Sequence, residues 1–237
     1  MPLSLTKLKA VQARGDLNVN AVSFIDESYS MNSGCQKNGG GESRWDVSHK
    51  VNAEVTRAVC KFDDDGIDLV FFNDRHTVHT GVTEDQVRAI FAKHRPNNGT
   101  SLAAPLEEII NKYLPATVKT PAKSGGFFGK ATPAVYNKIS PSKPVALLIW
   151  TDGCPSDRSR VEEVIIDASN RILKDEDLGI AVIQVGHDSG AAAWLKELDS
   201  GLVAKGAQFD VVAVVHFDEI QAAKLSPEDI IRVAFTG

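Results

Sequence analysis

The stretch VNAVSFIDESYS, from Val19 to Ser30, decides the fold of this chain. Its first part, up to Ile25, is rich in β-branched and apolar side chains, which is typical of a buried strand. A carboxylate and two hydroxyls follow at alternate positions, in the pattern D-x-S-x-S that begins at Asp26. Because an unpaired buried carboxylate is costly, a buried strand that ends in Asp26 indicates that positive charge is bound there.

Two further segments predict polar groups at the same place. A second buried-strand run, residues 145–150, also ends in a carboxylate, that of Asp152. Between the two strands, Thr100 directly precedes a helical pattern over residues 102–114. In open α/β sheets, ligands bind beyond the carboxyl ends of the strands. If the two strands are neighbours, Asp26, Thr100 and Asp152 converge on one cation.

The types of these side chains indicate which cation is bound. Carboxylate and hydroxyl oxygens suit Mg²⁺ or Mn²⁺, with Ca²⁺ as another hard cation, rather than zinc or copper. The alternative is that the same side chains only cap turns and the helix after Thr100. The predicted metal ligands are Asp26, Ser28, Ser30, Thr100 and Asp152.

The three segments together resemble a known family. The D-x-S-x-S pattern at residues 26–30, Gly-Thr at 99–100 and Thr-Asp-Gly at 151–153 are similar to the von Willebrand factor type A (vWA) domain and its metal-ion-dependent adhesion site (MIDAS). The resemblance covers nearly the whole chain. It also extends weakly to bacterial members associated with tellurium resistance and to copine-type domains.

The resemblance implies a role for each predicted ligand. The two serine hydroxyls would bind the metal directly, and Asp26 would act through water. Thr100 and Asp152 would complete the shell directly or through water, and an acidic group of a protein partner would take the open position. Tyr29 stands where the family usually has glycine, which changes the loop but removes no ligand.

The alternation of strands and helices predicts the fold class. We expect an α/β fold with a doubly wound, mostly parallel six-stranded sheet, one antiparallel edge strand and helices on both faces. The antiparallel edge strand is expected at residues 77–80. The other expected strands are residues 19–25, 67–72, 145–150, 178–186 and 209–215.

Composition agrees with a single vWA domain over residues 1–237. A net charge of -5 gives no general attraction to nucleic acid or to anionic membranes. No apolar run approaches the roughly 20 residues of a membrane span, and the first residues lack a signal-peptide core. Three cysteines without a framework spacing indicate a reducing compartment, so we expect a cytoplasmic protein.

Two segments lie outside this regular pattern. Residues 115–144 are rich in proline, lysine and glycine, and predict a flexible insertion that emerges opposite the metal. An extra edge strand is expected near residues 4–8.

Four further residues are candidates for a second site. His76 and His79 would point to opposite faces of a strand, so they are not expected to chelate one ion. Cys35 and Cys154 lie near the metal loops and are interpreted as two incidental thiols, with a redox pair as the alternative.

The sequence therefore predicts a metal-dependent protein-binding module without catalytic residues or an organic cofactor. Its partner would be a protein that presents an acidic residue. One alternative is a Mg²⁺-dependent hydrolase or phosphotransferase, although Ser28 stands where aspartyl-phosphate enzymes have a second Asp. Another is a scaffold whose metal site is vestigial and which binds partners through the basic insertion.

Overall fold

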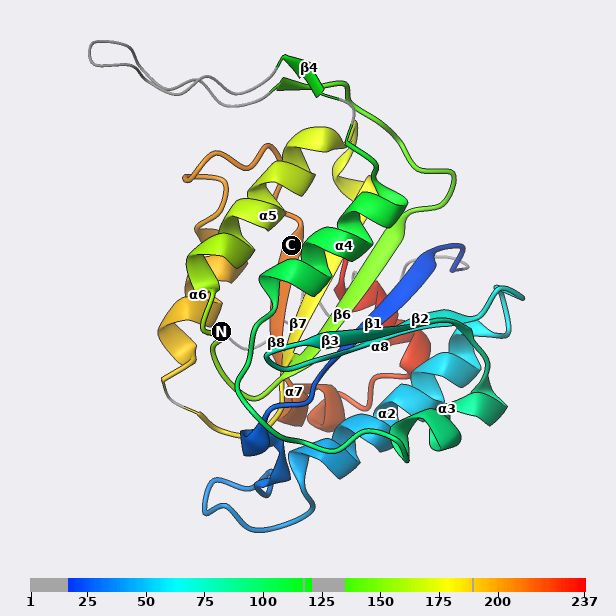
Figure 1. Ribbon diagram of the computed structural model, residues 1–237, viewed down its shortest axis with the longest axis vertical. Helices are drawn as coiled ribbons and strands as arrows, with labels where there is room; N and C mark the ends of the chain where they lie inside the picture. Colours follow the sequence, from blue (N-terminus) through cyan, green and yellow to red (C-terminus); the bar gives the residue numbers. More distant parts are fainter. Residues whose placement is uncertain (1–16, 117, 121–134, 189) are drawn as a thin grey trace.

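A computed structural model describes residues 17–116, 118–120, 135–188 and 190–237. A six-stranded sheet in the order β3-β2-β1-β6-β7-β8 forms its centre (Figure 1). All neighbouring strands are parallel except β3, which pairs antiparallel with β2 at the edge. The predicted fold class is thus confirmed. The strands are β1 Asn20–Asp26, β2 Ile67–Phe72, β3 His76–Val82, β6 Val145–Thr151, β7 Leu178–Gln184 and β8 Val212–His216.

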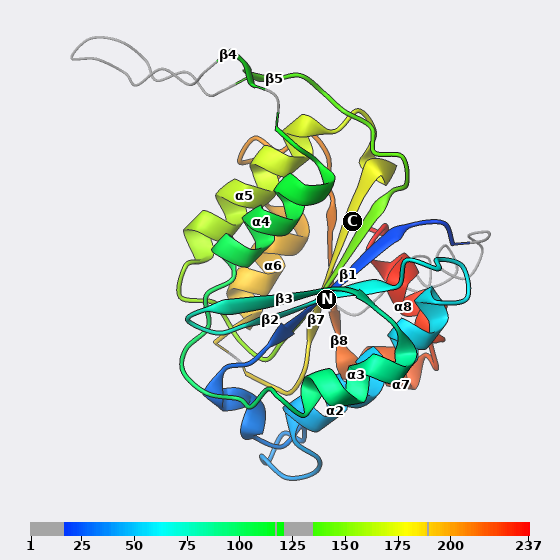
Figure 2. The ribbon, with the colours of Figure 1, turned by 45° about the vertical axis from the view of Figure 1, so that its right-hand side comes forward.

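Helices cover both faces of the sheet (Figure 2). One layer holds α4 Ala103–Tyr113, α5 Arg158–Arg171 and α6 Ala192–Ser200. The opposite layer holds α2 Arg44–Val59, α3 Glu84–Phe91, α7 Phe217–Ala222 and α8 Pro227–Val233. Two short 3₁₀ turns, η1 Tyr29–Asn32 and η2 Asp175–Asp177, complete the regular structure of the main body.

The side chains of β1 point alternately to the two faces of the sheet, and both faces are covered by helices. Val22 and Phe24 belong to the core that includes α4 and α5, whereas Ala21 and Ile25 belong to the core that includes α2 and α8. Successive side chains of a strand point to opposite faces, so β1 is apolar on both sides. Full burial of a side chain such as Phe24 contributes about 1.5–3 kcal/mol.

Two buried hydrogen bonds of Ser23 link β1 to β6 and to α2. The Trp150 indole donates to the Ser23 hydroxyl at 3.0 Å, and that hydroxyl donates to the amide oxygen of Asn52. Ile25 pairs with Trp150 in the parallel register, so Asp26 and Thr151 end their strands at the same edge. The register of the sheet therefore brings the first two predicted metal segments together.

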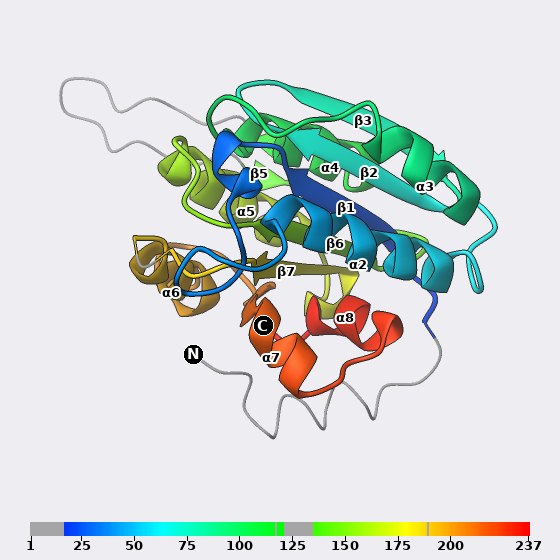
Figure 3. The same cartoon turned by 90° about the horizontal axis from the view of Figure 1, so that it is seen from below.

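Helix α2 runs from that edge along one face of the sheet. Its N-cap is Ser43, whose hydroxyl accepts from the backbone of Asp46 at 3.0 Å. The helix contacts α3 on one side and α8 on the other (Figure 3). It ends at Val59, where the next residues form a tight turn.

The 115–144 segment is described only in part. Two short strands, β4 Val118–Thr120 and β5 Val135–Tyr136, pair antiparallel at the end of the molecule opposite η1 (Figure 1). The rest of the predicted insertion, residue 117 and residues 121–134, lies outside the described residues. So does the strand expected near residues 4–8. Within the described residues, no helix combines the length and apolar character that crossing a membrane requires.

Candidate metal centre

Asp26 is the last residue of β1 and is fully buried. The backbone N–H of Ser28 donates to its Oδ1 at 2.8 Å. The hydroxyl of Thr151, the last residue of β6, donates to its Oδ2 at 2.7 Å. Both carboxylate oxygens are thus held in place, one by the following loop and one by the neighbouring strand.

A chain of side-chain hydrogen bonds joins three more of the predicted ligands. The hydroxyls of Ser28 and Ser30 are 3.1 Å apart, and the Ser30 hydroxyl donates to Asp152 Oδ1 at 2.9 Å. Ser28 and Asp152 are buried, whereas Ser30 is exposed. The loops after β1 and β6 therefore meet through oxygen atoms, as the sequence predicts.

Thr100 lies in a loop held against both of these segments. The N–H of Tyr29 donates to the carbonyl of Asn98 at 3.1 Å, and the N–H of Ser156 donates to the carbonyl of Thr100 at 2.8 Å. The contacts that place Thr100 thus use backbone atoms. Among the described residues, its hydroxyl takes no part in the hydrogen bonds that join the other four predicted ligands.

Asp157 positions this loop from the β6 side. Its carboxylate accepts from the Ser101 hydroxyl at 2.8 Å and from the N–H groups of Leu102 and Ala103 at 3.1 and 2.9 Å. Free N–H groups at the start of a helix need such acceptors. Asp157 therefore caps α4 from another segment and fixes the loop that carries Thr100.

The buried carboxylate of Asp26 carries an electrostatic cost. Its burial raises the pKa of Asp26 to about 7, the hydrogen bond from Ser28 opposes this rise, and the nearby charge of Asp152 adds to it. Burial and a like charge both disfavour the ionised form. A bound cation is the kind of group that would stabilise both carboxylates.

Arg44 is a neighbour of the centre that sequence reasoning missed. Its Nη1 lies 2.5 Å from Asp152 Oδ2 and 3.5 Å from the carbonyl oxygen of Ser30. Gly186 leaves room for this side chain, because a Cβ at this position would lie 2.3 Å from the Nε of Arg44. Its φ of +87° also favours glycine. Arg44 begins α2, and no sequence pattern links a first helical residue to a strand end.

Tyr29 and Glu27 both lie beside the centre, but only Tyr29 is open to contact by another molecule. Tyr29 is 73% exposed at the rim. The Glu27 carboxylate already has partners within the chain: its Oε1 accepts from the N–H of Arg95 at 2.8 Å and lies 3.3 Å from Nδ1 of His94. Glu27 therefore holds the segment after α3.

The remaining candidates from the sequence are placed as follows. The imidazole of His76 pairs with Glu108 at 2.8 Å, and that of His79 with His94 at 3.0 Å, so the two histidines use separate partners. All three cysteines are free, and the redox pair of Cys35 with Cys154 is not formed.

Comparison with known proteins gives a fold assignment. No protein-family model matches the chain, and no curated protein matches its sequence. Among solved structures, the PilB minor pilin from Streptococcus sanguinis is similar with a TM-score of 0.55 and 14% identity, over 92% of this chain and 63% of the pilin chain. The SpRpn10 VWA domain is similar with a TM-score of 0.50 and 11% identity, over 84% of this chain and 88% of that domain.

These likenesses show the fold alone, because the identities are low. The chain has the Rossmann-like architecture of a vWA domain. It spans less than two thirds of the length of the pilin chain that it matches.

Proposed function

We propose that this chain is a divalent-metal-dependent protein-binding module. The observation that carries the proposal is the hydrogen-bonded set formed by Asp26, Ser28, Ser30 and Asp152 at the carboxyl edge of the sheet. Thr100 is the fifth proposed ligand, and its loop is held against the same edge. No catalytic role is assigned to any of these side chains.

The donor set fits Mg²⁺, with Mn²⁺ or Ca²⁺ as alternatives. All the side-chain donors are carboxylate or hydroxyl oxygens, which hard divalent cations prefer. Asp26 is a buried carboxylate whose hydrogen bonds come from one N–H and one hydroxyl. When bound, the cation would supply an electrophilic centre for an oxygen ligand of another molecule.

The proposed partner is a protein that presents an Asp or Glu side chain. A carboxylate bound to a cation in a fixed oxygen cage makes a charge-assisted and directional contact. Tyr29 is exposed beside this centre and offers a large aromatic surface, and tyrosine is enriched among residues that dominate interface energies. The proposal includes a cytoplasmic location, which three free cysteines support.

Metal titration tests the site. We expect calorimetry with MgCl₂ to find one site on the EDTA-treated chain, and Asp26→Asn and Asp152→Asn each to weaken binding by at least about tenfold. The matched control is Glu108→Gln, which changes a carboxylate paired with His76 on another part of the surface. Equal Mg²⁺ affinity in all four proteins would refute the site.

Partner capture tests the function of the site. We expect proteins captured on the immobilised chain in Mg²⁺ to be released by EDTA and to be lost with Asp152→Asn. Partners kept by that variant would favour a scaffold with a vestigial site. Metal-dependent turnover of phosphoesters, lost in the same variant, would favour the hydrolase or phosphotransferase.

A further inference from the structure

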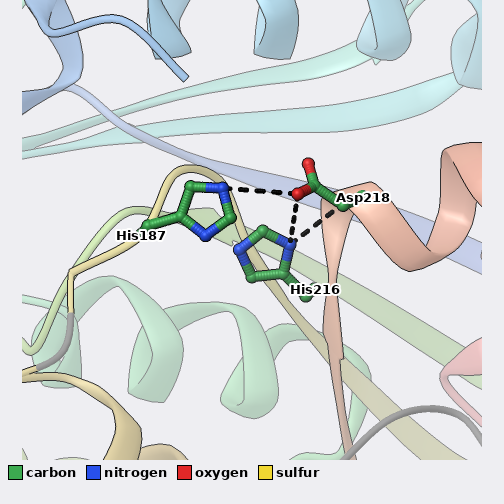
Figure 4. Close-up of side chains that lie close together, drawn as sticks. All are labelled: His187, His216 and Asp218. Carbon is green, nitrogen blue, oxygen red and sulfur yellow. Dashed lines mark hydrogen bonds and ion pairs between the residues drawn. The ribbon is translucent and has the colours of Figure 1, made fainter. Parts of the chain in front are cut away.

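A second polar cluster lies at the carboxyl ends of β7 and β8. His187 follows β7, His216 is the last residue of β8, and Asp218 lies in the first turn of α7. One ligand atom from each of the three residues lies within 4.8 Å of the other two. Figure 4 shows that nitrogens of both imidazoles face the same carboxylate.

The hydrogen bonds of His216 define which of its two nitrogens is unprotonated. Its Nε2 lies 2.7 Å from the carbonyl oxygen of Gly186, which only accepts, so Nε2 carries the proton. Its Nδ1 accepts from the N–H of Asp218 at 3.1 Å and is therefore unprotonated. A backbone carbonyl that fixes the tautomer in this way is the usual outer partner of a metal-binding histidine.

One of the three separations between ligand atoms already matches that around a small transition-metal ion, and the other two are longer. Asp218 Oδ2 lies 3.3 Å from His187 Nε2 and 3.8 Å from His216 Nδ1. Ligand atoms around a tetrahedral zinc ion, with bonds of about 2.0–2.1 Å, are roughly 3.3 Å apart. The two rings are nearly parallel, with centroids 4.6 Å apart and an angle of 23° between them, and a nitrogen of each faces the carboxylate (Figure 4).

We propose that His187, His216 and Asp218 form a zinc-binding site, separate from the oxygen-lined centre at Asp26. Two imidazoles and one carboxylate are a ligand set for Zn²⁺ rather than for Mg²⁺. His187 and His216 are half-buried and Asp218 is exposed, so a fourth ligand can reach the ion from solvent or from another molecule. The bound ion replaces the N–H of Asp218 as the partner of Nδ1.

Such a site joins two segments that are otherwise separate loops. It ties the residues after β7 to the junction between β8 and α7. Gly186, whose carbonyl orients His216, is also the residue that packs against Arg44 beside Asp152. Zinc at this cluster would therefore restrict the motion of Gly186, the residue against which the Arg44 side chain packs.

Spectroscopy and calorimetry on the EDTA-treated full chain test the proposal. We expect one equivalent of ZnCl₂ to bind, and CoCl₂ in its place to give the intense visible absorption of a four-coordinate ion. The double variant H187Q/D218N should weaken zinc binding by at least about tenfold. His216 is left unchanged in this variant because its ring also caps α7.

Two controls separate this site from other causes. His76→Gln removes an imidazole that pairs with Glu108 at 2.8 Å elsewhere, and Asp26→Asn alters the oxygen-lined centre. Both should keep the zinc stoichiometry and the cobalt spectrum. Zinc should raise the unfolding temperature of the wild type but not of H187Q/D218N, because only a ligand of the folded state stabilises it.

The proposal fails if H187Q/D218N binds zinc as tightly as the wild type, or if cobalt gives only a weak six-coordinate spectrum with the wild type. It also fails if Asp26→Asn abolishes zinc binding while H187Q/D218N keeps it. Failure here leaves the Mg²⁺ titration at Asp26 and Asp152 unaffected, because different side chains are changed.

Discussion

At the scale of single residues, the sequence predicts the two carboxylates of the centre but not the arginine beside them. Asp26 and Asp152 were predictable because parallel strands end at a common edge, and each follows a buried run. Arg44 was not, because its side chain reaches Asp152 from a helix start 108 residues earlier in the chain. No periodicity encodes that contact.

The same rule about strand ends would have identified His187 and His216. Both follow or end buried parallel strands that are neighbours in the sheet. The signal was the position of a histidine at the carboxyl end of a buried run, not its spacing from another histidine.

Arg44 yields a prediction with a definite sign. Arg44→Met keeps an apolar stem but removes the guanidinium that contacts Asp152. We expect Mg²⁺ affinity to rise by about tenfold, or ~1.4 kcal/mol, because a positive charge beside the centre opposes a second cation. Calorimetry measures this.

The control for that prediction is Arg57→Met, since Arg57 pairs with Glu54 and Glu84 on the surface. If Arg44→Met lowers the Mg²⁺ affinity or leaves it unchanged, the prediction is wrong, and Arg44 instead holds Asp152 in place for the metal.

At the scale of elements, helix starts depended on contacts that local sequence does not reveal. Helix α6 begins at Ala192 and has no side-chain cap at its first turn. The carboxylate of Asp188 accepts from the N–H of Gly190 at 2.7 Å and closes a local turn instead. Conversely, α4 takes its capping carboxylate from Asp157, which lies far along the chain.

This distant cap can be tested by Asp157→Ala. We expect a loss of about 0.5–2 kcal/mol in the free energy of unfolding, as for other lost helix caps. Mg²⁺ affinity should fall as well, because the loop with Thr100 loses its anchor. Urea unfolding and calorimetry measure the two effects, and Asp64→Ala, on an exposed turn, is the control. A stability loss with unchanged affinity would show that this loop does not serve the metal.

At the scale of the whole molecule, the mostly parallel sheet with helices on both faces follows from the sequence, because buried strands alternate with amphipathic helices. The small β4–β5 pair was not predicted. Strands of three and two residues are too short to show a period. The fold could thus be predicted from the sequence, whereas contacts between side chains of distant elements could not.

Global stability should depend on pH through two half-buried histidines. Burial, and then the nearby His94, lower the pKa of His79 below its ordinary value of 6.5, and burial likewise lowers the pKa of His49. The folded state then binds fewer protons than the unfolded state, so stability is full above pH 6.5 and falls as the pH drops below it.

Urea unfolding between about pH 7.5 and about pH 5, with EDTA present, measures this dependence. We expect His79→Gln to flatten the profile relative to the wild type. The control is His76→Gln, which changes a histidine of the same strand whose ring pairs with Glu108 of α4. Parallel profiles for the wild type and His79→Gln would contradict the assignment.

The indole of Trp150 sits in the middle of the sheet, two residues before Asp152 and hydrogen-bonded to Ser23. Trp45 and Trp194 are buried as well, so all three indoles of the chain are shielded from water. Native fluorescence should consequently be emitted at short wavelength and shift to the red when the chain unfolds. The molecule thus carries its own optical reporter, and no dye has to be attached near either cluster.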